Sequence, residues 1–244
     1  MISDNKIWMY WNDGLENAPK SVQLCINSWK VQNKNYEVVV LEDNTISEWI
    51  DIPKFQDTVM TIQAFSNILR IFLLSKYGGI WADATLWCTK PVDGWVDNYS
   101  DDFFVFSNPT DSRMISSWFV KSSKDNIILK EWKDRVIDYI ENTKVVINNF
   151  WFHGLFEKIY NENIDVRSQW DKVLKYDVNM NNQVLSNPLY FSRLFDEGLL
   201  NDLDDDFKFG VLNKTSPMYK LGWRRTNLVD TKKVKFLMGY GNDK

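Results

Sequence analysis

Cysteine and histidine are scarce in this sequence of 244 residues, which contains two cysteines and one histidine. Cys25 and Cys88 have no metal-ligand spacing and are too few for a disulfide framework, so they indicate a reducing compartment. Positive charge is not in excess either, because 29 basic and 33 acidic residues give a net charge of -4. A protein that binds nucleic acid needs a basic face for the phosphates, and the sequence argues against that class.

Long apolar runs are also missing. No stretch reaches the ~20 apolar residues of a membrane span, and the N-terminus lacks the basic region and apolar run of a signal peptide. We therefore expect a cytoplasmic protein, with peripheral membrane association as the only contact with a bilayer. A composition of 44% hydrophobic and 25% charged residues is typical of a globular chain, and the length favours a single domain over residues 1–244.

Aromatic residues, in contrast, are abundant, with 12 Trp, 10 Tyr and 15 Phe. Aromatic rings fill protein cores and also stack on sugar rings and bases, and for any single residue core packing is the commoner role. The composition leaves both roles open.

Apolar runs and helical periodicity alternate along the chain. The pattern predicts strands at residues 6–10, 36–41, 80–85, 103–106 and 115–120. It predicts helices after Pro19 and at residues 58–76, 124–141, 148–160 and 168–175, with Asp57 as the N-cap of the second helix. This alternation is typical of an α/β fold, with a central mixed sheet flanked by helices.

The helix expected at residues 58–76 carries three polar side chains on one side. Gln63, Asn67 and Arg70 are spaced i, i+4 and i+7, which places them in one row. Such a row is either a solvated face or a group that points into a site. The strand that follows Gly78 and Gly79 ends in Asp83, at the edge of an open α/β sheet where ligands bind.

The stretch from Arg70 to Thr85, which includes Gly78-Gly79-Ile80-Trp81-Ala82-Asp83, resembles the signature of the capsular polysaccharide synthesis family. That family belongs to the sugar transferases that carry an Asp-X-Asp motif. Residues 7–14, Ser117-Trp118-Phe119 and the segment around Phe152-His153-Gly154 are similar to it as well.

The resemblance implies a GT-A-like, Rossmann-like domain that binds a nucleotide sugar. Residues 1–125 would form its nucleotide-sugar-binding core, and residues 126–244 a helical acceptor-side and C-terminal part. The implied activity is that of a retaining glycosyltransferase, which moves a sugar from a nucleoside-diphosphate donor to a glycan or lipid-linked glycan in bacterial capsular or surface polysaccharide synthesis. The implied catalytic residues are Asp83 and His153, and the implied donor-binding residues are Trp11, Gly14, Gln63, Asn67, Arg70, Asp83, Ala84, Thr85 and Lys220.

A divalent ion, Mn²⁺ or Mg²⁺, would be held by Asp83 in such a site. Thr85 stands where the motif has its second Asp, and a neutral hydroxyl is a poor ligand for a hard cation. Either Asp83 holds the ion together with the donor diphosphate, or cations such as Lys220 replace it. We expect weak metal binding that requires the donor.

The roles of His153 and Lys220 and the class of activity stay open on the sequence alone. A lone histidine in an aromatic segment is often structural, and the default role of Lys220 is that of a surface lysine. A glycoside hydrolase would need a second carboxylate beside Asp83, roughly 5–9.5 Å away across the bond. A carbohydrate-binding protein on a decayed transferase fold is a further interpretation of the same motif.

Overall fold

The computed structural model describes residues 5–53, 58–99, 102–110, 112–148, 150–177 and 217–220. Its central sheet has the strand order β2-β1-β4-β7-β6-β9. These strands are β1 (Lys6–Tyr10), β2 (Glu37–Leu41), β4 (Gly79–Ala82), β6 (Phe103–Thr110), β7 (Arg113–Ser122) and β9 (Tyr176–Asp177). The strands β2, β1 and β4 are parallel, and β7 pairs antiparallel with β4, so the predicted mixed sheet is confirmed.

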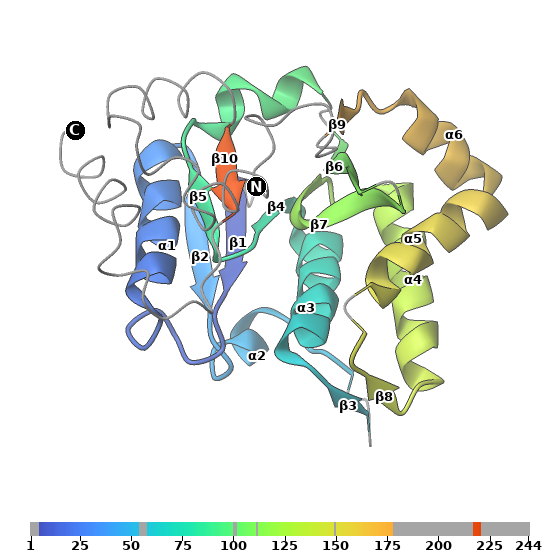
Figure 1. The fold of residues 1–244 in the computed structure, drawn as a ribbon, viewed down its shortest axis with the longest axis horizontal. Helices are drawn as coiled ribbons and strands as arrows, with labels where there is room; N and C mark the ends of the chain where they lie inside the picture. The colour runs from blue at the N-terminus through green and yellow to red at the C-terminus, as the bar shows by residue number, and fades with distance from the viewer. Residues whose placement is uncertain are drawn as a thin grey trace.

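Helices cover both faces of this sheet. Figure 1 shows β1, β2 and β4 between α1 on one side and α3 on the other. The helices are α1 (Lys20–Gln32), α2 (Ile46–Trp49), α3 (Ile62–Tyr77), α4 (Ile127–Glu141), α5 (Trp151–Glu162) and α6 (Ile164–Lys172), with short 3-10 turns at Val92–Gly94 and Val96–Asn98. Across the described ranges, no helix is both long enough and apolar enough to span a bilayer.

The strands divide their side chains between two cores. In β1, Ile7 and Met9 are buried with the apolar stripe of α1, while Trp8 and Tyr10 are buried with α3. Successive residues of a strand point to opposite faces, which explains this division. The apolar stripe of α1, formed by Val22, Cys25, Ile26 and Trp29, is therefore part of the core, and Cys25 is one of its fully buried members.

Two small pairings lie outside the central sheet. The strand β3 (Val59–Met60) is parallel to β8 (Val145–Val146). The strand β5 (Leu86–Cys88) pairs antiparallel with β10 (Met218–Lys220), in a register that places Lys220 opposite Leu86. This second pairing brings a segment from late in the chain beside the residues that follow β4.

Four helices start at other residues than the sequence predicts. Residues before α3 are extended because β3 pairs with β8, and the N-cap is Thr61, whose side chain accepts a hydrogen bond from the Ala64 amide at 3.1 Å. The predicted cap, Asp57, lies outside the described residues. Asn126 caps α4 and Asn163 caps α6, so both predicted starts, 124 and 168, are wrong. The helix predicted at 148–160 is α5, which begins and ends slightly later.

Candidate functional site

The carboxyl ends of β1, β2 and β4 lie at one edge of the sheet, because the three strands are parallel. The loop after β1 begins with a turn in which the Gly14 amide donates to the Trp11 carbonyl at 2.9 Å. Gly14 has a φ of 80°, a left-handed backbone conformation that glycine adopts without strain. The loop predicted to contact the nucleotide therefore lies at the same edge as Asp83.

Asp83 begins a tight turn directly after β4. Its amide donates to the Trp118 carbonyl at 2.9 Å, and its carbonyl accepts from the Leu86 amide at 2.9 Å. Ala84 and Thr85 form the middle of this turn and are buried. Asp83 is therefore held by backbone hydrogen bonds on both sides.

The carboxylate of Asp83 contacts two cations and an indole. Its Oδ1 accepts hydrogen bonds from Trp81 Nε1 at 2.9 Å and from Arg70 Nη2 at 3.3 Å. Its Oδ2 accepts from Lys220 Nζ at 2.6 Å. Burial by itself would raise the pKa of Asp83, but the charges of Lys220 and Arg70 outweigh burial and hold that pKa below its usual value. Asp83 is therefore an anion at neutral pH.

Arg70 is buried beneath this carboxylate, with 4% of its surface exposed. Its guanidinium donates to the Ser66 carbonyl at 3.2 Å, to the Ser66 hydroxyl at 3.1 Å, and to the Ser117 carbonyl. Its central carbon lies 5.0 Å from the ring centroid of Trp81 and 5.8 Å from that of Phe152. Burial lowers the pKa of Arg70 to about 10, so the side chain is still a cation at neutral pH.

The row of polar residues on α3 is not a solvated face. Asn67 is 5% exposed and Arg70 is 4% exposed, so the solvated-face interpretation is wrong for both, whereas Gln63 is half-buried. Within the part of the chain that the structure describes, neither Gln63 nor Asn67 forms a hydrogen bond with Asp83. Of the three, only Arg70 contacts the carboxylate.

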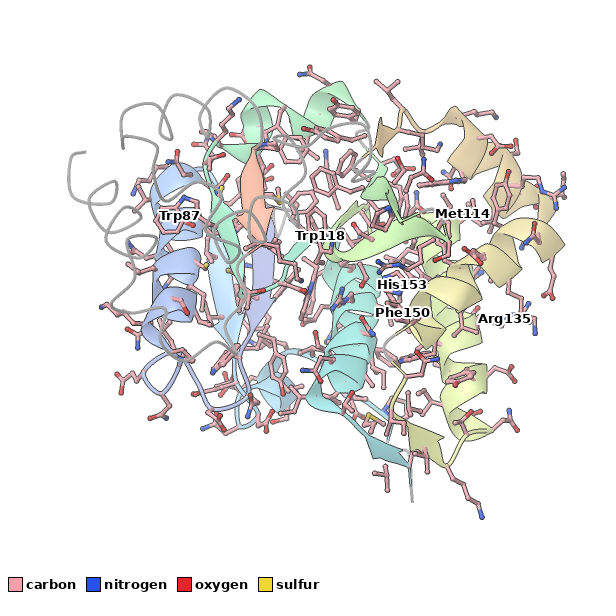
Figure 2. All side chains as sticks on the ribbon, in the orientation of Figure 1. Trp87, Met114, Trp118, Arg135, Phe150 and His153 are labelled. Atoms are coloured by element: carbon pink, nitrogen blue, oxygen red, sulfur yellow. The ribbon has the colours of Figure 1, made fainter. Side chains whose placement is uncertain are left out.

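His153 lies in the first turn of α5, beside α3 (Figure 2). It is 7% exposed, and its Nδ1 is buried without a hydrogen-bond partner among the described residues. Burial and, after it, the charge of Arg113 lower the pKa of His153 to about 3. Arg70 and Lys220 add to this effect and Asp83 opposes it, so all four charges lie near the imidazole. The ring is neutral and weakly basic, and a buried polar atom of this kind is a candidate contact for a ligand.

An exposed aromatic ring stands next to His153. Phe150 is 56% exposed, and its ring centroid lies 6.3 Å from that of His153. The guanidinium carbon of Arg113, from the start of β7, lies 4.9 Å from the Phe150 centroid. Figure 2 shows Phe150 and His153 together at the start of α5. Sequence patterns did not single out Phe150, because one exposed aromatic residue gives no periodic signal.

The structure brings three of the predicted residues into direct contact, namely Arg70, Asp83 and Lys220. Lys220 is a partly buried member of this cluster and not a free surface lysine. Trp81, which sequence reasoning did not assign to the site, is the third contact of Asp83. Its position two residues before Asp83 could have indicated this, because residues i and i+2 of a strand share a face.

The residues of this site do not fit a preformed divalent metal site. Both oxygens of Asp83 already accept hydrogen bonds from cations, and Thr85 offers only a neutral hydroxyl. Among the described residues, no three His, Cys, Asp or Glu side chains are grouped so that they could hold a metal ion. Hard cations prefer several anionic or carbonyl oxygens, which this cluster does not present.

Comparisons with known proteins agree with the resemblance noted in the sequence. Two curated fungal proteins match part of the chain: O-glycosyltransferase braB of Annulohypoxylon truncatum and glycosyltransferase afumC of Aspergillus fumigatus (strain CBS 144.89 / FGSC A1163 / CEA10). The first is 24% identical over 155 residues, which is 54% of this chain and 37% of that protein. The second is 24% identical over 150 residues, which is 52% of this chain and 38% of that protein. The chain therefore matches less than two fifths of each relative.

Solved structures with a similar arrangement are more distant. The PaToxG glycosyltransferase is 18% identical with a TM-score of 0.44, over 68% of this chain and 72% of that one. A glycosyltransferase involved in the glycosylation of the major capsid of PBCV-1 is 9% identical with a TM-score of 0.47, over 97% and 98%. The galactosyltransferase LgtC is 11% identical with a TM-score of 0.42, over 96% and 95%.

The decisive comparison is with a family profile described as "Capsular polysaccharide synthesis protein", which matches residues 1–236. That range contains every residue of the cluster around Asp83 and nearly the whole chain. The chain belongs to the capsular polysaccharide synthesis protein family.

Proposed function

We propose that this chain is a glycosyltransferase domain of the GT-A type, which moves a sugar from a nucleoside-diphosphate sugar to a carbohydrate acceptor. The observation that carries the proposal is the Asp83 carboxylate at the carboxyl end of β4, ionised and held between Arg70 and Lys220. Membership of the capsular polysaccharide synthesis family supports it, as do the names of the two curated relatives. We further propose that the sugar keeps its anomeric configuration.

Glycosyl transfer makes two electrostatic demands on a site. Negative charge grows on the diphosphate as the bond to the sugar breaks, and positive charge grows on the sugar carbon. Fixed charges placed beforehand stabilise such changes without reorganising during the reaction. We propose that Lys220 stabilises the negative charge on the diphosphate and that Asp83 stabilises the positive charge on the sugar carbon. Each side chain is held in place by the other before a ligand arrives.

The acceptor side of the site is proposed at the start of α5. Phe150 presents an exposed ring on which a sugar can stack, and the neighbouring Nδ1 of His153 lacks a partner within the described part of the chain. Because His153 is neutral, we propose that it orients a sugar hydroxyl through a hydrogen bond and does not act as a strong base. A glycan, or a lipid-linked glycan at the inner face of the cytoplasmic membrane in a bacterium, is the acceptor class that this function implies.

The proposal is tested by donor binding followed by turnover. A ligand present at 100 times its dissociation constant stabilises the folded state by about 2.7 kcal/mol, which is readily seen in a thermal shift. Nucleotide sugars are screened in this way, and those that bind are assayed for release of the nucleoside diphosphate in the presence of glycan acceptors.

Asp83→Asn is the variant that links the activity to the site. It removes a charge with almost no change in volume, and we expect transfer per folded molecule to fall by about 100-fold or more. Because the buried Arg70 loses its counter-ion, the melting temperature should fall as well, so activity is compared at a temperature where both proteins are folded. The matched control is Asp97→Asn, since Asp97 also pairs with a lysine, Lys121, at 2.5 Å, and Lys121 lies opposite Ile80 near the start of β4 and not beside Asp83. Equal activity of the two variants would contradict the role of Asp83. Binding of nucleotide sugars without turnover in the parent protein would instead indicate a binding protein.

A further inference from the structure

We propose that the ammonium group of Lys220 stabilises the leaving diphosphate in this chain, in the place that a divalent ion would take beside the carboxylate of an Asp-X-Asp motif. The inference rests on the proposed function and deepens it. The evidence for it is the set of hydrogen bonds that Asp83 accepts. Its Oδ1 accepts from residues of the protein interior, and its Oδ2 accepts from Lys220.

The interior oxygen of Asp83 is fully used. Trp81 and Arg70 both donate to Oδ1, and Arg70 is itself fixed by Ser66, by the Ser117 carbonyl and by the Trp81 ring. Trp81 belongs to β4 and Arg70 to α3, so this oxygen is held from two separate parts of the fold. The carboxylate group therefore cannot rotate freely. Only Oδ2 is therefore directed toward an arriving ligand.

Lys220 occupies that remaining oxygen. Its Nζ lies 2.6 Å from Oδ2, and both side chains reach the surface, with 26% of Lys220 and 23% of Asp83 exposed. A divalent ion at Oδ2 would have to displace the ammonium or lie against it, and like charges at contact distance repel. The neighbouring Thr85 cannot compensate, because it carries no charge.

An ammonium in this position can also bind phosphate oxygens. It has three N–H donors, and the described contacts use one of them, for Asp83 Oδ2. Arg70 and Lys220 together carry one more positive charge than Asp83 can neutralise, while His153 is neutral. The excess charge suits an anion such as a nucleoside diphosphate.

The backbone fixes the position of Lys220. β10 pairs with β5, and Lys220 lies opposite Leu86, three residues after Asp83. Backbone pairing therefore delivers the lysine to the turn that carries the carboxylate. It forms the charge pair before a ligand arrives, as a fixed electrostatic site requires.

The transfer of the sugar needs no metal ion to account for its electrons and its proton. The bond between the sugar C1 and the diphosphate oxygen breaks, and its electron pair stays on that oxygen, where Lys220 offsets the charge. A new bond forms between C1 and the oxygen of the acceptor hydroxyl, and the proton of that hydroxyl passes to the departing diphosphate.

Calorimetry of UDP and GDP, each in excess chelator and then with Mn²⁺, tests the inference. We expect the parent protein to bind at least one of them in chelator, with little gain from Mn²⁺. Lys220→Met keeps the apolar stem and removes the charge, so the diphosphate should bind about 10–100-fold more weakly, while UMP or GMP should lose less. Lys121→Met is the control. Lys121 pairs with Asp97 and lies on β7 opposite Ile80, near the start of β4, so this variant should bind the diphosphate as the parent does.

Two results would overturn the inference. One is binding of the diphosphate by the parent protein only when Mn²⁺ is present, a measurement that does not depend on any variant folding. The other is equal affinity of Lys220→Met and the parent in chelator. If the parent binds neither nucleotide under any condition, and no other nucleotide sugar raises its melting temperature, the proposed function fails and the inference fails with it.

Discussion

Replacing Arg70 with methionine should destabilise the fold strongly, because the buried guanidinium supports several polar groups at once. Methionine is long and unbranched and can fill the space beside Trp81 and Phe152. The substitution leaves the Asp83 carboxylate without one of its two cations and removes the donor from the Ser117 carbonyl. Breaking a buried ion pair by removing one partner costs about 3–5 kcal/mol. A chain of this size loses about 2–4 °C for each kcal/mol, so the melting temperature should fall by about 6–20 °C.

Differential scanning calorimetry of the purified variants measures this change. The matched control is Arg135→Met on α4, where the guanidinium pairs with Glu162 at 2.8 Å and the two side chains are 33% and 48% exposed. A surface pair contributes about 0–1 kcal/mol, so the control should change the melting temperature by no more than about 4 °C. If Arg70→Met falls within the range of the control, the guanidinium does not support the site.

Two further predictions concern acid stability and helix capping. In the unfolded chain His153 takes up a proton near its ordinary pKa of 6.5, whereas burial lowers its pKa in the folded chain to about 3. The free energy of unfolding should therefore decrease as the pH falls from 6.5 to 3, by at most about 1.4 kcal/mol per pH unit. His153→Gln should flatten this decrease in chemical denaturation curves, and parallel curves for parent and variant would contradict burial of the neutral ring. Thr61→Ala removes the side-chain acceptor for the Ala64 amide and should cost about 0.5–2 kcal/mol in the same assay; no change would mean that α3 does not depend on this cap.

Five of the six strands of the central sheet could be predicted because each carries a local signal, whereas β9 was missed because it has only two residues. The run from Ile80 to Ala82 is apolar, follows two glycines and leads to a carboxylate, and β4 lies there. The strand ends at Ala82, before the predicted end at residue 85, because Asp83 begins a turn. The row of Gln63, Asn67 and Arg70 was equally visible from helical spacing, although spacing alone could not show that two of the three are buried.

Contacts between distant segments could not be predicted from the sequence. The start of α3 is delayed because β3 pairs with β8, a partner more than eighty residues further along the chain, and propensity in a short window does not include such a pairing. The same holds for Lys220, which reaches Asp83 only because β10 pairs with β5. The ion pair that defines the candidate site depends on a pairing that no local pattern encodes.

The division of β4 between two cores makes position 83 sensitive to insertions and deletions. Ile80, Ala82 and Ala84 are buried with α1, whereas Trp81 is buried with α3, on the side where Arg70 meets Asp83. Deleting one residue between the glycines and Asp83 would reverse this alternation and direct the carboxylate into the apolar core beside α1. A substitution at position 83 can therefore change its chemistry within the same fold, whereas a change in the number of residues before it would remove the carboxylate from the site.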